Sequence, residues 1–307
     1  MGNPLTSRQF VRLLDDRLTK VYSDETKDLP PIIDQLYTTI KDKKAWQEYY
    51  AIGDIPDPVE FTGTTVYQSV APGYHTKIEP TEYAGGIEIQ RRLIDTDRYD
   101  IIEGRAKGLG RAALRKMNKI AHEPFIYFNS SAFSFMESEE GVALCSNSHT
   151  TKASGVSTST GFDNLSTLVF SPTNLEALRL QSLGLRSDIG ERMETNFDTI
   201  IHGSTLTEQV WELLNSQKKV DTAENNENFQ KGRWKSIELP LLDDYDTNNW
   251  MIVDSAAMKR YLLWIESIPL EFENTTDFDT MVRKYRDYFV IGHGFTNWRW
   301  IIGSVVS

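Results

Sequence analysis

The segment GGIEIQRRLIDTDRYDIIEGRAKGLGRAALRKMNKIAH, residues 85–122, joins a strand pattern to the longest helix pattern in the chain. Ile87 and Ile89 alternate with polar residues, as expected for a strand with one buried face. From Asp100 to His122 the apolar residues recur in steps of three and four and form one stripe, made of Ile102, Ala106, Leu109, Ala113, Met117 and Ile120. The segment therefore predicts a strand that leads into a long helix, which ends before Pro124.

Three glycines interrupt the first half of this helix pattern, at Gly104, Gly108 and Gly110. Each costs about 1 kcal/mol relative to alanine in a helix, because glycine loses more backbone freedom on folding. We therefore expect the helix to be bent or loosely held near its start, and we assign these glycines to its flexibility.

The composition is that of an acidic folded protein. The chain has 307 residues, of which 44 are acidic and 33 basic, and a net charge of −11. A protein that holds nucleic acid through its phosphates needs a basic face, because each contact displaces condensed counterions. No apolar run approaches the roughly 18 residues of a membrane span, and the N-terminus lacks the apolar region of a signal peptide. We expect no membrane contact and no sequence-specific DNA binding, whereas a position beside DNA is compatible with this charge.

The N-terminal part of the chain lacks a core of its own. Residues 4–50 show two short amphipathic helix patterns broken by DLPP, and residues 53–63 predict an extended linker rich in Pro, Gly and Asp. Two strand patterns follow, TTVYQSV (64–70) and GGIEIQRRL (85–93), and we expect them to pair as a long hairpin. A lone hairpin is marginal in water, so these parts predict packing on another chain.

Residues 138–265 alternate helix and strand patterns and predict an α/β domain. The expected elements are helices 173–187 and 206–216 and buried strands 198–203 and 250–254. The expected capping boxes are Thr173 with Glu176 and Thr205 with Glu208. The polar excursion 218–233 is too long for a tight turn and predicts a functional tip. From residue 269 onward the pattern is rich in strands and ends in an apolar tail, which we expect to be buried.

Cys145 and His149 are the most suggestive pair for catalysis, because a thiolate activated by an imidazole is a common nucleophile. However, the partners of such a thiol are usually distant in sequence, and the acidic residues before Cys145 would raise its pKa rather than lower it. The five histidines are scattered, without the spacing of a metal site. We therefore predict a polar loop here, and we expect no catalytic, cofactor or metal site and no enzyme activity.

The order of these parts and several stretches of sequence resemble one family. The stretches are EFTGTTVYQSV (60–70), EYAGGIEIQRRLIDTDRYDII (82–102), GVALCSNSHTT (141–151), FSPTNLEALRLQ (170–181), KKVDTAENNENFQKGRW (218–234), TNNWMIVDSAAMKRYLLW (247–264) and PLEFENTTDFDTMVRKYRDYFVIGHGFTNWRWIIG (269–303). Together they resemble the major capsid (head) protein of tailed bacteriophages, which has the HK-ninety-seven fold also seen in encapsulin shells. The branch they resemble is that of the Mu-type head subunits.

The resemblance implies an α+β fold with four parts. These are an N-terminal arm (1–58), an extension-loop hairpin (59–97), a peripheral domain with a long spine helix (98–137 plus 267–307) and an α/β axial domain (138–266). In this arrangement the arm and the hairpin lie on neighbouring subunits, which explains why they lack a core of their own.

The resemblance also implies contacts between subunits. The candidate contact residues are Phe61, Tyr67, Tyr74, Lys77, Arg91, Arg92, Asp95, Arg98, Asn225, Asn226 and Phe229. The arginines near Asp95 either pair across subunits at the root of the hairpin or form solvated local pairs, which contribute about 0–1 kcal/mol each. Some relatives crosslink a lysine of the extension loop, for which Lys77 is the candidate in this chain, but nothing local selects its partner and we predict no bond. The three glycines are expected to let the spine helix bend as the shell expands.

The implied function is structural. The chain would self-assemble into pentamers and hexamers of an icosahedral phage head that encloses double-stranded DNA, without a cofactor. The implied partners are other copies of the chain, a separate scaffold protein, a portal, a decoration protein and packaged DNA contacted non-specifically. The implied place is the virion, after assembly in the host cytoplasm. The arm starts almost at Met1, so the scaffold is either a separate protein or already removed. Two alternatives stay open, an encapsulin-type shell around an enzyme cargo and a cysteine hydrolase that uses Cys145.

Overall fold

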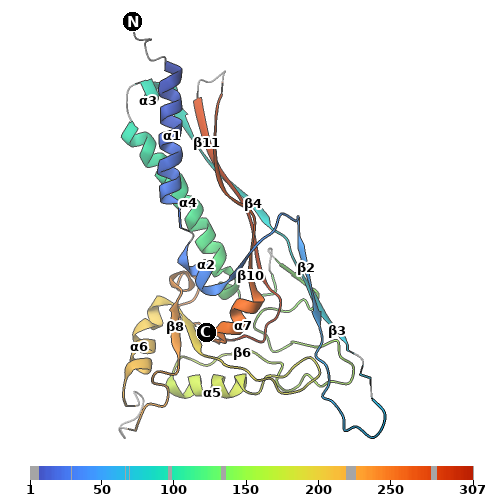
Figure 1. Ribbon diagram of the computed structural model, residues 1–307. Helices are drawn as coiled ribbons and strands as arrows, with labels where there is room; N and C mark the ends of the chain where they lie inside the picture. Colours follow the sequence, from blue (N-terminus) through green and yellow to red (C-terminus); the bar gives the residue numbers. More distant parts are fainter. Residues whose placement is uncertain are drawn as a thin grey trace.

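The computed structural model describes residues 7–28, 30–65, 67–68, 70–95, 99–132, 136–218, 226–277 and 282–306. They form a mixed structure of helices and three β-sheets, which confirms the predicted α+β class. Figure 1 shows a long upper part, where helices run beside extended strands, and a broad base with a projection on its right side. Among these residues no helix is long and apolar enough to cross a membrane.

The upper part is built on a four-stranded sheet with the order β1-β10-β11-β4. Its strands are β1 (Thr38–Lys41), β10 (Leu262–Thr276), β11 (Val282–Phe295) and β4 (Thr81–Gln90). Helices α1 (Ser7–Glu25) and α4 (Tyr99–Ile126) run along one face of the sheet, and the short helix α3 (Arg91–Asp95) lies near its upper end (Figure 1). A small buried cluster joins these elements and consists of Leu18, Ile89, Ile102, Ala106 and Tyr285.

The base is built on a five-stranded sheet with the order β6-β12-β9-β7-β8. Its strands are β6 (Leu165–Ser166), β12 (Ile301–Ser304), β9 (Trp250–Val253), β7 (Thr199–His202) and β8 (Lys235–Glu238). The remaining helices are α2 (Pro31–Leu36), α5 (Pro172–Ser182), α6 (Thr207–Asn215) and α7 (Ser255–Tyr261), with the 3-10 turns η1 (Ser204–Leu206) and η2 (Pro240–Leu242). Every residue of β7, β9 and β12 is buried, as expected for central strands covered on both faces. The main hydrophobic core therefore lies in the base, around Trp250 and Trp300.

The position of β12 corrects the expected grouping of residues 267–307 with the spine helix. β12 pairs with β9 in antiparallel and with β6 in parallel orientation. A Cβ atom at Gly303 would lie only 2.5 Å from the ring of Phe128 and 3.0 Å from Cys145 Sγ, so the glycine lets the strand approach these side chains. The C-terminal strand therefore belongs to the base, whereas β10 and most of β11 belong to the upper part.

Helix α4 confirms the predicted long helix, and all six residues of the predicted apolar stripe are buried. Pro124 was expected beyond the helix end but lies inside its last turn. A proline removes one backbone hydrogen bond of the helix. The next residue, Phe125, is fully buried and packs against Trp300, with 6.2 Å between ring centroids.

The three glycines of α4 have different surroundings. A Cβ atom at Gly110 would lie 2.9 Å from Thr26 Cγ2 and 3.5 Å from Tyr22 Cε2, so this glycine allows α1 to pack closely. Gly104 and Gly108 are exposed, and nothing lies within 4 Å of a Cβ atom built on either. Packing explains Gly110, whereas flexibility at Gly104 and Gly108 stays a prediction.

The predicted hairpin of residues 64–70 with 85–93 is wrong. β4 pairs with β11, and its inner face, which carries Ile89, meets Tyr285 and Leu18 in the small cluster. The described residues of 64–70 form no strand. The pairing partner of a strand is the one that lets its apolar face be buried, and local sequence patterns do not identify that partner.

A second sheet takes the place of that hairpin. β2 (Gln47–Ile52) pairs antiparallel with β3 (Pro72–Ile78), and β3 pairs with β5 (Met136–Ser138). From here on, the arm means residues 46–78, that is Trp46, β2, β3 and the chain between the strands, and not the N-terminal arm (1–58) expected from the resemblance. The arm descends along the right side of the molecule and its tip projects beyond the base (Figure 1).

Several local predictions also need correction. The N-terminal region was expected to hold two helices up to residue 50, but α2 has only six residues and two strands follow it. Helix α5 is capped by Ser171, whose Oγ accepts from the Asn174 N–H at 3.1 Å, rather than by Thr173. Thr205 lies in a 3-10 turn and its N–H donates to Asp243 Oδ2 at 3.0 Å. In both cases another side chain satisfies the free helix N–H groups.

The root of the arm is fixed by Glu139. Its Oε2 accepts from the backbone N–H of His75 at 3.0 Å and lies 2.7 Å from His75 Nδ1, and its Oε1 accepts from Lys152. The hydrogen bond from Lys152, followed by those from His75, lowers the pKa of this carboxyl to about 2. Glu139 therefore links β3 to the polar loop 139–152 of the base.

We predict that Gly108→Ala and Gly110→Ala have opposite effects on the isolated subunit. Gly108→Ala should raise the free energy of unfolding by about 0.5–1 kcal/mol, because alanine restricts the unfolded chain and meets no neighbour. Gly110→Ala should lower it by about 1 kcal/mol or more, because the new methyl group overpacks the contact with α1. Urea unfolding measures both values, and equal values would contradict the packing role of Gly110.

We predict that Glu139→Gln loosens the root of the arm, seen as faster hydrogen exchange at the His75 amide. The pKa of Glu139 is lowered in the folded state, so the link is present above the ordinary range near 4.5 and is lost as pH falls toward 2. The protection factor of the same amide in the unmodified chain, its exchange rate relative to an unstructured peptide at the same pH, should therefore fall in acid. Glu137→Gln, on the adjacent strand β5, is the matched control and should leave this amide unchanged. Equal exchange in the two variants would contradict the assignment.

Candidate assembly surfaces

The arm exposes apolar side chains that the subunit itself does not cover. The exposed large apolar residues of the arm are Trp46, Tyr50, Ile52, Ile55, Val59, Phe61, Tyr67 and Val70. Tyr67 is 92% and Ile52 83% exposed, which is nearly the value of an isolated side chain. A run of exposed apolar residues marks an interaction surface in a soluble protein. The arm thus presents an uncovered apolar surface to solvent.

Phe61 and Tyr67, which were predicted as contact residues, lie at the tip of the arm and face solvent. Tyr74 and Lys77 lie on β3 near the root and have partners within the chain. The Tyr74 hydroxyl is 2.6 Å from Thr150 Oγ1, and Lys77 Nζ is 3.0 Å from Glu79 Oε2 and lies over the Trp46 ring. A contact of these residues with another subunit stays a prediction.

The predicted arginine cluster lies elsewhere than expected. Arg91 and Arg92 begin α3, at the end of β4 that is farthest from the arm (Figure 1). The side chain of Asp95 and the whole of Arg98 lie outside the described residues. Arg91 and Arg92 therefore lie away from the arm, because β4 continues upward along β11, and their pairing across subunits stays a prediction.

The polar excursion 218–233 is described only at its two ends. Residues 219–225, and with them Asn225, lie outside the described residues, while Asn226 is exposed. Phe229 is 61% exposed, and the guanidinium groups of Arg233 and Arg179 lie 5.0 and 6.0 Å from its ring centroid. This aromatic side chain therefore has contacts within the chain and is still largely exposed.

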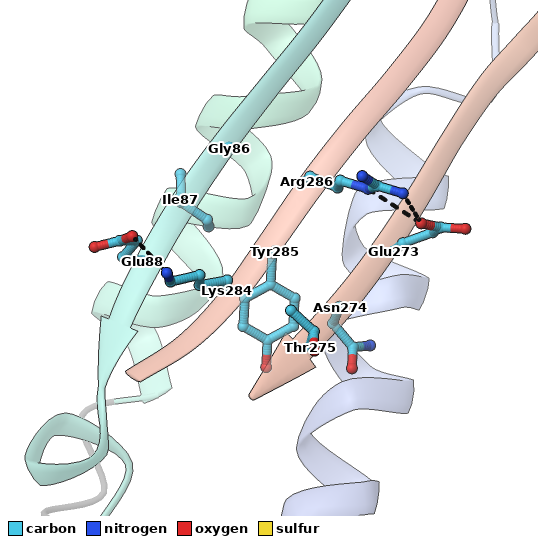
Figure 2. Close-up of a pocket in the computed structure, with 9 residues that line it drawn as sticks. All are labelled: Gly86, Ile87, Glu88, Glu273, Asn274, Thr275, Lys284, Tyr285 and Arg286. Atoms are coloured by element: carbon cyan, nitrogen blue, oxygen red, sulfur yellow. Dashed lines mark hydrogen bonds and ion pairs between the residues drawn. The ribbon is translucent and has the colours of Figure 1, made fainter. Parts of the chain in front are cut away.

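The outer face of the four-stranded sheet forms an open groove of about 650 Å³ across β4, β11 and β10. Figure 2 shows the side chains that line it, with the helices behind the sheet. Lys284 Nζ lies 3.6 Å from Glu88 Oε1, and Arg286 donates to Glu273 Oε2 at 2.6 Å. These charges are paired across neighbouring strands.

Cys145 lies in the core and not in a catalytic site. It is fully buried beside Gly303 and Phe128, and burial raises the pKa of its thiol far above the ordinary range. His149 is also buried, stacks on Trp298 with 4.0 Å between ring centroids, and holds Glu140 Oε1 at 3.1 Å through Nδ1. Both side chains have structural roles, and the cysteine-hydrolase alternative loses its nucleophile. The described residues also contain no group of three or more potential metal ligands.

The apolar part of the arm contributed by β2 was missed by the sequence analysis. The segment QEYYAI, residues 47–52, alternates half-buried and exposed side chains, which is a strand signal of period two. This strand was not predicted because it lies in a region that was interpreted as helix and linker. Tyr50 and Ile52 are therefore additional contact candidates.

Comparison with known proteins identifies the family. The model of a family described as phage capsid protein matches residues 74–304, about three quarters of the chain. A second model, described as the Mu-like prophage major head subunit gpT, matches residues 11–134. No curated protein sequence matches the chain.

Solved structures share the fold at low sequence identity. The procapsid of bacteriophage JBD30 is 13% identical over 99% of this chain and 77% of that chain, with a TM-score of 0.53. The capsid of the native GTA particle is 13% identical over 90% and 89%, with a TM-score of 0.54. The capsid of cyanophage Pam1 is 8% identical over 88% and 87%, with a TM-score of 0.56. The predicted HK-ninety-seven fold is confirmed, and the chain belongs to the phage capsid protein family as a major capsid protein of phage heads.

Proposed function

We propose that many copies of this chain assemble through their arms into pentamers and hexamers of an icosahedral head around double-stranded DNA. The observation that supports this proposal is the run of exposed apolar residues on the arm, from Trp46 to Val70, which has no cover within the subunit. The arm of each copy lies over the next copy in the same ring.

The free energy of association requires that several arm residues are buried in the same contact. Burying one large apolar side chain contributes about 1.5–3 kcal/mol, while association costs about 4–15 kcal/mol in lost freedom. A single contact is therefore insufficient, and several residues of the arm must be buried together. Because the arm leaves one side of the subunit, its contact is head-to-tail, and such contacts close into rings when the rotation between copies is right.

Further partners follow from the family resemblance. We include a separate scaffold protein, a portal, a decoration protein and assembly in the host cytoplasm before incorporation into the virion. DNA is contacted non-specifically, since the net charge of −11 does not favour holding phosphates. Strong, salt-sensitive binding of free DNA by the isolated subunit would contradict this part. An encapsulin-type shell with an enzyme cargo has no observation in its favour.

We predict that Ile52→Ser combined with Tyr67→Ser gives a folded subunit that does not assemble. Both side chains are almost fully exposed, so the subunit keeps its own core, while the apolar surface for a neighbour is lost. Sedimentation velocity measures assembly, and circular dichroism checks the fold. Ile52→Val with Tyr67→Phe, which keeps the apolar surface, is the matched control and should assemble. Normal assembly of the serine variant would count against the arm as the principal contact.

We predict that Gly104→Ala with Gly108→Ala impairs expansion of the assembled shell without unfolding the subunit. Both glycines are exposed and unconstrained in the subunit, and alanine stiffens the helix at these positions. The diameter of shells before and after maturation, measured by electron microscopy, reports expansion. Unaltered expansion would contradict the proposal that these glycines make the helix flexible.

A further inference from the structure

The upper sheet and the base meet at the lower end of α4. Here α4 enters the main core beside α2 and the lower ends of β10 and β11 (Figure 1). Two histidines lie in this region, His122 on α4 and His293 on β11, and they are 2% and 3% exposed. We define the joint as residues 116–126 of α4 and 289–295 of β11.

The last turn of α4 depends on contacts with other elements. Pro124 lies in this turn and cannot donate a backbone hydrogen bond. The hydroxyl of Tyr37, which follows α2, donates to the Ala121 carbonyl at 2.7 Å. Glu123 Oε2 lies 3.3 Å from His293 Nε2. The end of the helix is thus attached to β11 and to the chain after α2 by side chains.

The surroundings of His122 favour its neutral form. Its Nδ1 lies 2.7 Å from the Asn118 carbonyl oxygen, and because a carbonyl accepts, this nitrogen carries the proton. Its Nε2 is buried, and within the described part of the chain it has no hydrogen-bond partner. A second proton on the ring would place a charged N–H group where no acceptor receives it, which is costly in a buried site.

His293 is buried between α4 and β10. From α4, the Glu123 carboxylate attracts a positive charge on the imidazole and Lys116 repels it. From β10, Trp264 places its ring centroid 6.2 Å from that of His293. The other titratable groups of this region act on the carboxylate and are Tyr37, after α2, and Tyr83, on β4.

Burial lowers the pKa of both histidines below the ordinary value of 6.5. The hydrogen bond to Asn118 opposes this shift for His122, and the interaction with Glu123 opposes it for His293, but burial is the larger effect on each pKa. The stability that the neutral rings contribute is therefore present above pH 6.5. It is lost as the pH falls through the lowered pKa values.

We propose that His122 and His293 make the joint an acid-sensitive contact within the subunit. Above pH 6.5 both rings are neutral, and the last turn of α4 stays packed against β11. In mild acid the rings take up protons when the joint opens to water, so the open form gains stability. The upper sheet and the base then stay folded but are less firmly connected. This inference concerns a single subunit and goes beyond the proposed function, since it holds whether or not copies assemble.

The test is hydrogen exchange of the full-length chain, measured by mass spectrometry at about pH 8 and pH 5.5, below the concentration at which it assembles. Protection factors compare each exchange rate with that of an unstructured peptide at the same pH, which removes the intrinsic effect of acid. The joint should lose protection by about tenfold for each histidine, because opening takes up one proton per ring. Residues 85–90 of β4, which pair with residues 282–287 of β11 further up the sheet, should lose much less.

Glutamine at each position removes the titration and keeps an amide that donates a hydrogen bond. His122→Gln with His293→Gln should abolish most of the loss of protection in the joint. Each single variant should reduce that loss by about tenfold, so the test does not depend on the folding of the double variant. The matched control is His202→Gln, which removes a buried histidine from β7 of the base, where burial also lowers the pKa. This control should leave the acid response of the joint unchanged.

Three results would overturn the proposal. They are an unchanged acid response of the joint in the single and double variants, loss of that response in His202→Gln, and an equal loss of protection in residues 85–90, which would indicate unfolding of the whole subunit. Failure of the chain to assemble at any concentration would contradict the proposed function and leave these three outcomes unaffected, so the two failures are distinguishable.

Discussion

Burial of the apolar stripe of α4 is the interaction on which the rest of the subunit depends. The upper half of the stripe, with Ile102 and Ala106, packs in the small cluster under α1 and the four-stranded sheet. The lower half, with Met117 and Ile120, enters the main core of the base. One continuous helix thus joins the upper sheet to the base. It also turns its charged face outward, because a helix with one buried stripe must expose the other side.

In contrast to α4, the arm leaves its apolar side chains exposed. Its root is held by Glu139, His75 and Lys152, but its tip has no contact that would bury Phe61 or Tyr67. A monomer with this surface is poorly suited to remain alone in water. The chain belongs to the phage capsid family, and we propose that other copies of the chain cover what one copy exposes. The folded subunit is therefore only part of the stable structure.

Sequence patterns predicted those elements whose periodicity is local. The stripe of α4 and the buried strands β7 and β9 are confirmed, since their own side chains identify the buried face. Strand pairing was not predictable in this way. β4 pairs with β11 and β12 joins the base, because these partners complete buried faces far away in the sequence. On the arm, Phe61 and Tyr67 were predicted as contact residues and are exposed in the structure. The strand β2 was not predicted, because it lies in a region interpreted as helix and linker. No local pattern indicated that the side chain of Cys145 is buried in the core.

The most direct test of the account is the mass distribution of the purified full-length chain, measured by sedimentation and electron microscopy across a range of protein concentrations. We expect rings of five or six copies, tubes or closed shells, with the proportion of assembled material rising with protein concentration. A compact monomer at every concentration, unchanged when a scaffold protein is added, would contradict it.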